Sequence, residues 1–114
     1  MADCLFCKIA EGKIPAKIVH QDKDTVAFED INPQAPLHVL VIPRAHVPTM
    51  NDLTREHDGV MGKLFRVAAI LAKEKGVAES GWRAVMNANA DAGQTVFHVH
   101  LHVIGGRQMS WPPG

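Results

Sequence analysis

Histidine alternates with apolar residues along the stretch from Phe97 to Gly106, which reads FHVHLHVIGG. Side chains on a β-strand point alternately to the two faces of its sheet. In a strand, the histidines at this stretch share one face: His98, His100 and His102. The valines and the leucine between them share the other face. The pattern therefore predicts a strand with one face for the core and one face for chemistry.

Three imidazoles in a row suit a reactive site better than a packed core, because each buried ring nitrogen needs a hydrogen-bond partner. The simplest alternative is a solvated strand face that happens to carry histidines. Two chemical interpretations compete with it. Imidazole is a common metal ligand, and open zinc sites can use three histidines. Alternatively, the middle ring is a nucleophile whose neighbours bind the charge of the group attacked.

The bulk properties predict one small domain spanning residues 1–114. A chain of this length is near the commonest domain size and can bury a core without disulfides. Twelve basic and twelve acidic residues cancel, so no nucleic-acid partner is expected from bulk charge. No apolar run has the length of a membrane span, and Asp3 and Lys8 interrupt the start. We therefore expect no membrane association and a cytoplasmic location.

Hydrophobic periodicity predicts an α+β domain with an antiparallel sheet of about five strands, one short helix and one long helix. The strands are expected at residues 16–21, 25–30, 37–43, 81–89 and 97–106, and the helices at 3–11 and 52–75. Asp3 is the expected N-cap of the short helix, and Phe6 and Ile9 are its expected buried residues. The first two strands form a hairpin, and the long helix covers one face of the sheet.

Cys4 and Cys7 lie three residues apart and so share one face of the predicted short helix. In a reducing compartment such a pair is more often a metal or redox site than a structural disulfide. Cys-x-x-Cys supplies half of a tetrahedral zinc site. A thioredoxin-like redox motif fits less well, because no strand opening a βαβ unit precedes the pair. A structural zinc site and a pair of small core thiols both remain open.

The run His-apolar-His-apolar-His-apolar-apolar resembles the signature of the histidine triad (HIT) family of nucleotide hydrolases and transferases. The C-terminal stretch from Gly105 to Gly114, GGRQMSWPPG, is similar to the end of the Hint branch, the histidine triad nucleotide-binding proteins. The segments Ile14–Lys17 and Pro33–Pro36 extend the resemblance over nearly the whole chain. It implies a HIT-like fold, a purine nucleotide substrate of the AMP type, and a homodimer in which Trp111 reaches toward the partner's site.

The resemblance also assigns roles to individual residues. His100 is implied as the nucleophile, His102 as a donor to a phosphate oxygen, and His38 as a residue that supports the site. On this reading Asp30 accepts hydrogen bonds from the ribose hydroxyls, which suits a carboxylate because it has two acceptor oxygens. Thr95 stands where the family has a serine. The residues implied to bind the nucleotide are Phe6, Ile9, Phe28, Asp30, Ile31, Asn87, Gly93, Thr95 and Trp111.

The same resemblance completes the cysteine pair with two histidines, because some members with this pair hold a structural zinc ion. The implied ligands are Cys4, Cys7, His46 and His98. His98 thus carries two expected roles, as a zinc ligand and as a support for the catalytic strand. Catalysis itself is expected to require no cofactor.

The Hint-like features imply hydrolysis of purine nucleoside phosphoramidates, in which His100 forms a nucleotidyl-histidine intermediate and water then releases AMP. Two alternatives keep the fold and change the reaction: dinucleoside polyphosphate hydrolysis and nucleotidyl transfer. A third is a nucleotide-binding regulatory partner protein. A fourth is a metal-dependent enzyme in which the three histidines hold an open zinc site.

Overall fold

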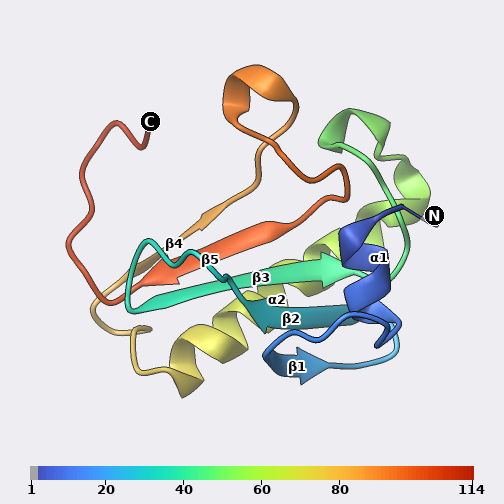
Figure 1. The fold of residues 1–114 in the computed structure, drawn as a ribbon. Coiled ribbons are helices and arrows are strands. Elements are labelled where there is room, and N and C mark those ends of the chain that lie inside the picture. The colour runs from blue at the N-terminus through green and yellow to red at the C-terminus, as the bar shows by residue number, and fades with distance from the viewer. Residues whose placement is uncertain (1–2) are drawn as a thin grey trace.

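The computed structural model describes residues 3–114, in which five strands form one antiparallel sheet in the order β1-β2-β3-β5-β4 (Figure 1). The strands are β1 (Ile18–Gln21), β2 (Thr25–Glu29), β3 (Leu37–Pro43), β4 (Trp82–Val85) and β5 (Leu101–Gly105), and the helices are α1 (Leu5–Ala10) and α2 (Asp58–Glu74). The predicted α+β fold, the hairpin of the first two strands and the single long helix are confirmed.

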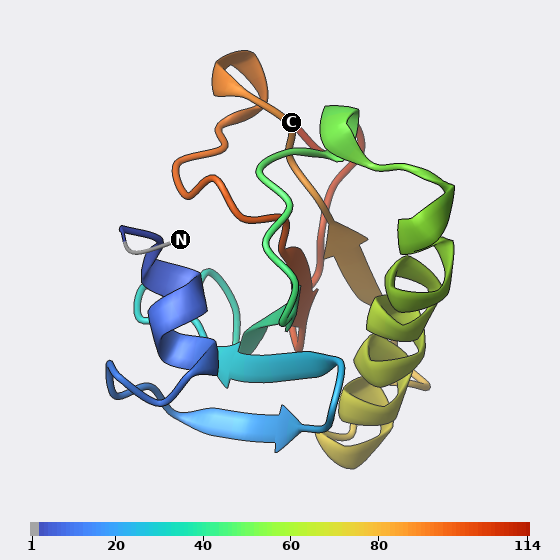
Figure 2. The same ribbon diagram turned by 90° about the vertical axis from the view of Figure 1, so that its right-hand side faces the viewer.

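The two helices lie on opposite faces of the sheet (Figure 2). The stripe of apolar residues on α2 packs against one face, and the buried members of this cluster include Val39, Leu64, Leu71, Leu101 and Val103. The shorter α1 packs on the other face, in a second cluster made of Phe6, Ile9, Val26, Phe28, Leu40 and Ile42. Within the described residues, neither helix is long and apolar enough to cross a membrane.

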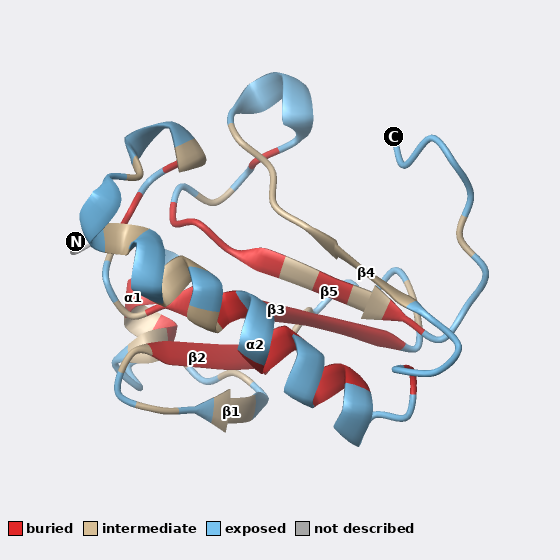
Figure 3. Cartoon of the chain, turned by 180° about the vertical axis from the view of Figure 1, so that it is seen from behind, coloured by how far each residue is buried: buried red, intermediate tan, exposed pale blue. Residues whose placement is uncertain are grey.

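Strand β3 is buried along its whole length, as Figure 3 shows. It lies between β2 and β5, and both of its faces are covered. A strand buried on both faces reads as a continuous apolar run, which is why its bounds match the predicted 37–43. In the register with β5, Leu40 pairs with His102 and His38 pairs with Ile104. His38 and His102 are therefore diagonal neighbours on one face, within reach of each other.

The start of α1 differs from the prediction, because Cys4 and not Asp3 is the N-cap. The Cys4 Sγ accepts a hydrogen bond from the backbone N–H of Cys7 at 3.3 Å. The expected inward-facing residues, Phe6 and Ile9, are buried. The same cysteine that was expected as a metal ligand thus also begins the helix.

The long helix begins later than predicted, at Asp58, because two threonine caps open short 3₁₀ turns before it. Thr49 Oγ1 accepts from the N–H of Asn51 at 3.0 Å, and Asp52 Oδ2 accepts from the N–H of Thr49 at 3.1 Å. The second turn, Arg55–His57, ends where α2 starts. The expected start near residue 52 is therefore wrong, whereas the end is within one residue of the prediction.

Strands β4 and β5 are shorter than the predicted strands at residues 81–89 and 97–106. Pairing between β4 and β5 ends at Val85 and His102, so residues 86–89 lie outside the sheet. Upstream of β5, the N–H of Val99 donates to the carbonyl of Val47 in a loop at 2.8 Å. The assigned strand therefore begins at Leu101 and not at Phe97. The first hairpin is also trimmed, to residues 18–21 and 25–29.

A polar cluster ties α2 to the β1–β2 turn. The carboxylate of Asp22 accepts from the N–H groups of Asp24 and Thr25, both at 2.8 Å, and from Thr25 Oγ1 at 2.9 Å. Lys63 of α2 places its Nζ 3.2 Å from Asp22 Oδ1 and 3.0 Å from Asp24 Oδ2. Burial opposes ionisation of Asp22, but hydrogen bonds from His20, Asp24 and Thr25 outweigh it and lower the pKa of this carboxyl.

Candidate active site

A cavity of about 550 Å³ opens on the α1 side of the sheet, a size typical of small-molecule sites. Its walls come from α1 and the segment after it, from the end of β2, and from the histidine stretch with the loop before it. Eight of the residues predicted to bind nucleotide or to act on it line the cavity: Phe6, Ile9, Phe28, Asp30, Ile31, Thr95, His100 and His102. Apolar side chains predominate, and Asp30, Thr95 and the two histidines supply polar groups.

Three predicted nucleotide-binding residues, Asn87, Gly93 and Trp111, are not among the residues that line this cavity. Gly93 has φ of +89° with open space around its Cα, so glycine is favoured there by backbone conformation and not by crowding. Trp111 is 83% exposed near the C-terminus. Within the described chain, the structure therefore brings only Thr95 of the predicted phosphate-binding loop to the cavity wall.

His100 is held in one orientation at the cavity. Its Nδ1–H donates to the carbonyl of His98 at 2.7 Å, which leaves the Nε2 lone pair free. The rings of Phe6 and His100 form a T-shaped pair, with centroids 5.0 Å apart and an interplanar angle of 88°. Burial lowers the pKa of His100, and the hydrogen bond to His98 opposes that effect only partly. His100 is thus a neutral imidazole with an available nitrogen.

A chain of hydrogen bonds sets the tautomers of His38 and His102. The backbone N–H of Gln34 donates to His38 Nδ1 at 3.0 Å, so the proton of His38 is on Nε2. That Nε2–H donates to His102 Nδ1 at 2.9 Å, which leaves the proton of His102 on its own Nε2. Burial, followed by repulsion from His100 and His38, lowers the pKa of His102 to about 4. His102 is therefore a neutral hydrogen-bond donor beside His100.

His98 points away from the cavity and is fully buried. Its Nε2–H donates to the carbonyl of Pro43 at 2.8 Å, and its Nδ1 lies 3.4 Å from Cys4 Sγ and 3.5 Å from Cys7 Sγ. Cys7 Sγ lies 3.4 Å from His46 Nδ1. The structure thus brings together the four residues that the resemblance implied as zinc ligands, with all their ligand atoms within 4.8 Å of one another.

This four-residue cluster fits a tetrahedral zinc ion. Zinc–sulfur bonds of about 2.3 Å and zinc–nitrogen bonds of about 2.0 Å place sulfur and nitrogen ligands about 3.5 Å apart in a tetrahedral site. The measured Sγ to Nδ1 separations match this value. The bond from His98 Nε2 to a backbone carbonyl is the outer-shell contact typical of a histidine ligand. Without a metal, burial raises the pKa of the Cys7 thiol.

The three histidines of the strand do not converge on one point. Among residues 3–114, the candidate metal-binding groups place His98 with the cysteines, and His102 with Asp30 and His38. The second group is not a ready metal site, because His38 Nε2 carries the proton that it donates to His102. The geometry therefore does not favour an open zinc site built from His98, His100 and His102.

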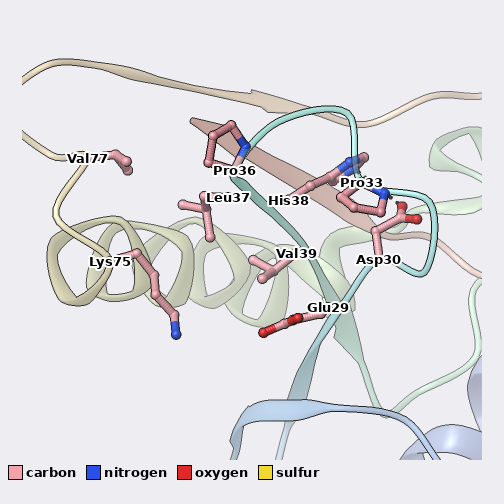
Figure 4. A pocket seen from close by; sticks show the side chains of 9 residues that line it. All are labelled: Glu29, Asp30, Pro33, Pro36, Leu37, His38, Val39, Lys75 and Val77. Carbon is pink, nitrogen blue, oxygen red and sulfur yellow. Dashed lines mark ion pairs between the residues drawn. The ribbon is translucent and has the colours of Figure 1, made fainter. Parts of the chain in front are cut away.

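A second, smaller hollow of about 250 Å³ lies between the C-terminal end of α2, the start of β3 and the loop before it (Figure 4). Lys75 and Val77 line one end, and Asp30 and His38 line the other. Asp30 contributes to the walls of both hollows. The volume of the smaller hollow is below the range typical of ligand pockets, so the larger cavity is the candidate substrate site.

One buried polar residue beside the cavity was not predicted from the sequence. Gln94 is 5% exposed, and its carboxamide forms hydrogen bonds with Asn89, Pro48 and Val96. A single glutamine in a loop belongs to no periodic pattern, so hydrophobic periodicity gives no signal for it. Its position directly before Thr95 is the only sequence feature that could have drawn attention to it.

Comparison with protein families matches residues 11–109 to the HIT domain. The chain is 46% identical over 107 residues to the purine nucleoside phosphoramidase of Escherichia coli (strain K12), covering 94% of this chain and 90% of that protein. It is also 46% identical over 112 residues to an uncharacterised HIT-like protein of Synechocystis, covering 98% and 97% of the two chains.

Solved structures give the same picture. A HIT family hydrolase from Legionella pneumophila Philadelphia 1 superposes with a TM-score of 0.97 at 50% identity, covering 98% of this chain and 100% of that chain. A histidine triad protein from Clostridium difficile superposes with a TM-score of 0.93 at 38% identity, covering 96% of each chain.

Proposed function

Because the chain belongs to the HIT domain family, we propose that this nucleotide hydrolase acts on purine nucleoside phosphoramidates and releases AMP and an amine. The relative from Escherichia coli carries this activity in its name and matches 94% of the chain. The alternatives within the family, dinucleoside polyphosphate hydrolysis and nucleotidyl transfer, have no relative of that name among the similar proteins described above.

The observation that carries the proposal is the orientation of His100, whose Nδ1–H is fixed on the His98 carbonyl. Its neutral Nε2 attacks phosphorus, and the phosphorus–nitrogen bond to the amine breaks. The departing nitrogen takes up one proton from solvent, which the water consumed in the second step returns, while the neutral His102 donates a hydrogen bond from its Nε2–H to a phosphate oxygen. Water then attacks the phosphorus of the nucleotidyl-histidine, the bond to Nε2 breaks, and AMP leaves with His100 restored.

The remaining cavity residues hold the substrate in this proposal. Phe6, Ile9, Phe28 and Ile31 provide apolar walls for the purine, and Asp30 accepts hydrogen bonds from the ribose hydroxyls. The hydroxyl of Thr95 binds a phosphate oxygen. Asn87 and Gly93 belong to the loop that supports Thr95 and do not line the cavity.

We assign Cys4, Cys7, His46 and His98 as the ligands of a structural zinc ion. When bound, the ion would cross-link the short helix α1 to the catalytic strand, and it would take no part in the reaction. A thiolate-rich site of this kind suits a reducing compartment, which is consistent with a cytoplasmic location.

We also propose a homodimer. Phe65 and Ile70, on the outer side of α2, are 54% and 41% exposed, and Trp111 is 83% exposed. Strand β4 pairs with β5 alone and has a free edge within the described sheet. A second copy of the chain would cover these apolar groups and this edge, with Trp111 reaching toward the partner's site.

Turnover of an adenosine phosphoramidate with a fluorescent amine tests the proposed reaction. We expect the wild type to release the amine, and His100→Ala to release none above background while still binding AMP by calorimetry. His57→Gln, at the start of α2, is the matched control and should keep wild-type activity. Activity that survives a strong chelator supports a structural metal only. Near-normal turnover by His100→Ala, or loss of turnover in a chelated but folded protein, would refute the mechanism.

A further inference from the structure

The connection between β4 and β5, residues 86–100, is long for a compact domain and contains only one short turn, Ala90–Ala92. It nevertheless carries Thr95 to the wall of the nucleotide cavity. A loop without regular pairing is fixed only if other groups bond its backbone N–H and C=O groups. In this loop, the side chain of Gln94 provides such bonds.

The carboxamide of Gln94 bonds three backbone groups from different parts of the chain. Its Oε1 accepts from the N–H of Asn89 at 2.8 Å. Its Nε2 donates to the carbonyl of Pro48 at 2.8 Å and to the carbonyl of Val96 at 3.1 Å. The side chain is almost completely buried, so water cannot replace these bonds when they are lost.

We propose that Gln94 is a positioning residue that holds Thr95 at the phosphate end of the cavity. Thr95 stands between Gln94 and Val96, and the bond from Gln94 Nε2 to the Val96 carbonyl closes a ring across it. The bond to the Pro48 carbonyl anchors that ring to the segment that follows β3. Thr95 is thereby fixed on both sides, although its own side chain is exposed to the cavity.

The backbone of Asn89 shows that Gln94 also holds a strained part of the loop. Asn89 has φ of +66° and ψ of −175°, and it is the only described residue other than glycine with a positive φ. Such a conformation is strained and persists only when its surroundings enforce it. Gln94 bonds both backbone groups of Asn89, because its own N–H also donates to the Asn89 carbonyl at 3.1 Å.

This inference rests on the proposed function for its meaning in catalysis. A hydroxyl that binds a phosphate oxygen contributes most when charge develops there, so a misplaced Thr95 should lower kcat more than it raises KM. Displacement of a catalytic contact by about 1 Å can lower a rate by about 100-fold. The base and ribose contacts of Phe6, Phe28 and Asp30 do not depend on Gln94.

Gln94→Met removes all three side-chain hydrogen bonds at similar volume and without adding charge. We expect kcat for the adenosine phosphoramidate to fall about 10- to 100-fold, with KM within about threefold of the wild type. Thr25→Val is the matched control, because Thr25 is a fully buried residue whose hydroxyl bonds Asp22 far from the cavity. It should lower the melting temperature and leave kcat unchanged, with both variants assayed where circular dichroism shows them folded.

Two further measurements separate positioning from general stability. In a Thr95→Val background, Gln94→Met should have little additional effect on kcat, because the group that it positions is absent. AMP affinity should fall about fivefold in Gln94→Met, whereas adenosine affinity should stay the same, since adenosine lacks the phosphate. The ratio of AMP affinity to adenosine affinity is measured without turnover. It therefore tests the role of Gln94 even if the wild type fails to hydrolyse the phosphoramidate and the proposed function is wrong.

Four outcomes would each overturn the proposal. For kcat, they are an unchanged value in Gln94→Met, an equal loss in Thr25→Val, and effects of Gln94→Met and Thr95→Val that are fully additive. For binding, it is an equal loss of AMP and adenosine affinity in Gln94→Met.

Discussion

Acidification should destabilise this protein through His102 by about 3 kcal/mol. The ring has an ordinary pKa of 6.5 in the unfolded chain and a pKa of about 4 in the folded protein, because burial and the neighbouring His100 and His38 disfavour its charge. Between these two values the unfolded chain takes up a proton and the folded protein does not, so stability falls as the pH falls. Each pH unit in this window corresponds to about 1.4 kcal/mol.

The stabilising effect of a neutral His102 is therefore complete above pH 6.5, is lost progressively as the pH falls toward 4, and does not change further below that. The free energy of unfolding of a typical domain is roughly 5–15 kcal/mol, so the loss of about 3 kcal/mol is a large fraction of the total stability. Urea unfolding at half-unit intervals from pH 7.5 to pH 4, with a chelator present throughout, measures it. His102→Gln is the comparison, because an amide oxygen still accepts from His38 Nε2–H but cannot titrate.

The wild type should lose about 3 kcal/mol more than His102→Gln between pH 6.5 and pH 4. Parallel curves for the two proteins would refute the reasoning, since they would mean that His102 has the same affinity for protons in the folded and unfolded states.

Two other substitutions test the clusters outside the cavity. Cys4→Ser should lower the melting temperature more than it lowers activity, because it removes both a proposed zinc ligand and the thiol that begins α1; equal melting temperatures of variant and parent would argue against a structural zinc. Asp22→Asn should cost about 1.5–3 kcal/mol in urea unfolding at pH 7, because hydrogen bonds to a charged group are lost. Because the pKa of Asp22 is lowered on folding, this difference should begin to shrink as the pH falls below about 4, the usual pKa of an aspartate, and continue to shrink at lower pH as the folded protein takes up the proton. A difference independent of pH would contradict it.

Regular parts of the fold were predictable because burial imposes a period on the sequence. The apolar run of β3 gave the observed bounds, and the spacing of Leu64, Val67 and Leu71 identified the buried side of α2. Element ends were less predictable, since they depend on single hydrogen bonds. The caps formed by Thr49 and Thr54 delayed α2, and neither interrupts the hydrophobic pattern.

In the candidate site, too, the periodic pattern was predictable and the individual contacts were not. Alternation in the histidine stretch indicated which residues share a face, but it could not show that His98 turns to the cysteines while His100 and His102 line the cavity. That separation depends on contacts with Pro43 and His38, which come from another strand. Gln94 was missed for a related reason. Its three partners are backbone groups, which every residue type has, so the amino-acid sequence does not indicate the contacts.

The contact between Cys4 and His98 joins residues 94 positions apart in the chain. During synthesis from the N-terminus, α1 is soon followed by the residues of β2 and β3 on which Phe6 and Ile9 pack, whereas His98 emerges much later. A six-residue helix is too short to be stable alone, and the two thiols lack their contact with His98 until nearly the whole chain has left the ribosome. The cavity is consequently among the last parts of the protein to be completed, and a chain truncated before His98 would contain the cavity residues of α1 and β2 without His100 and His102 opposite them.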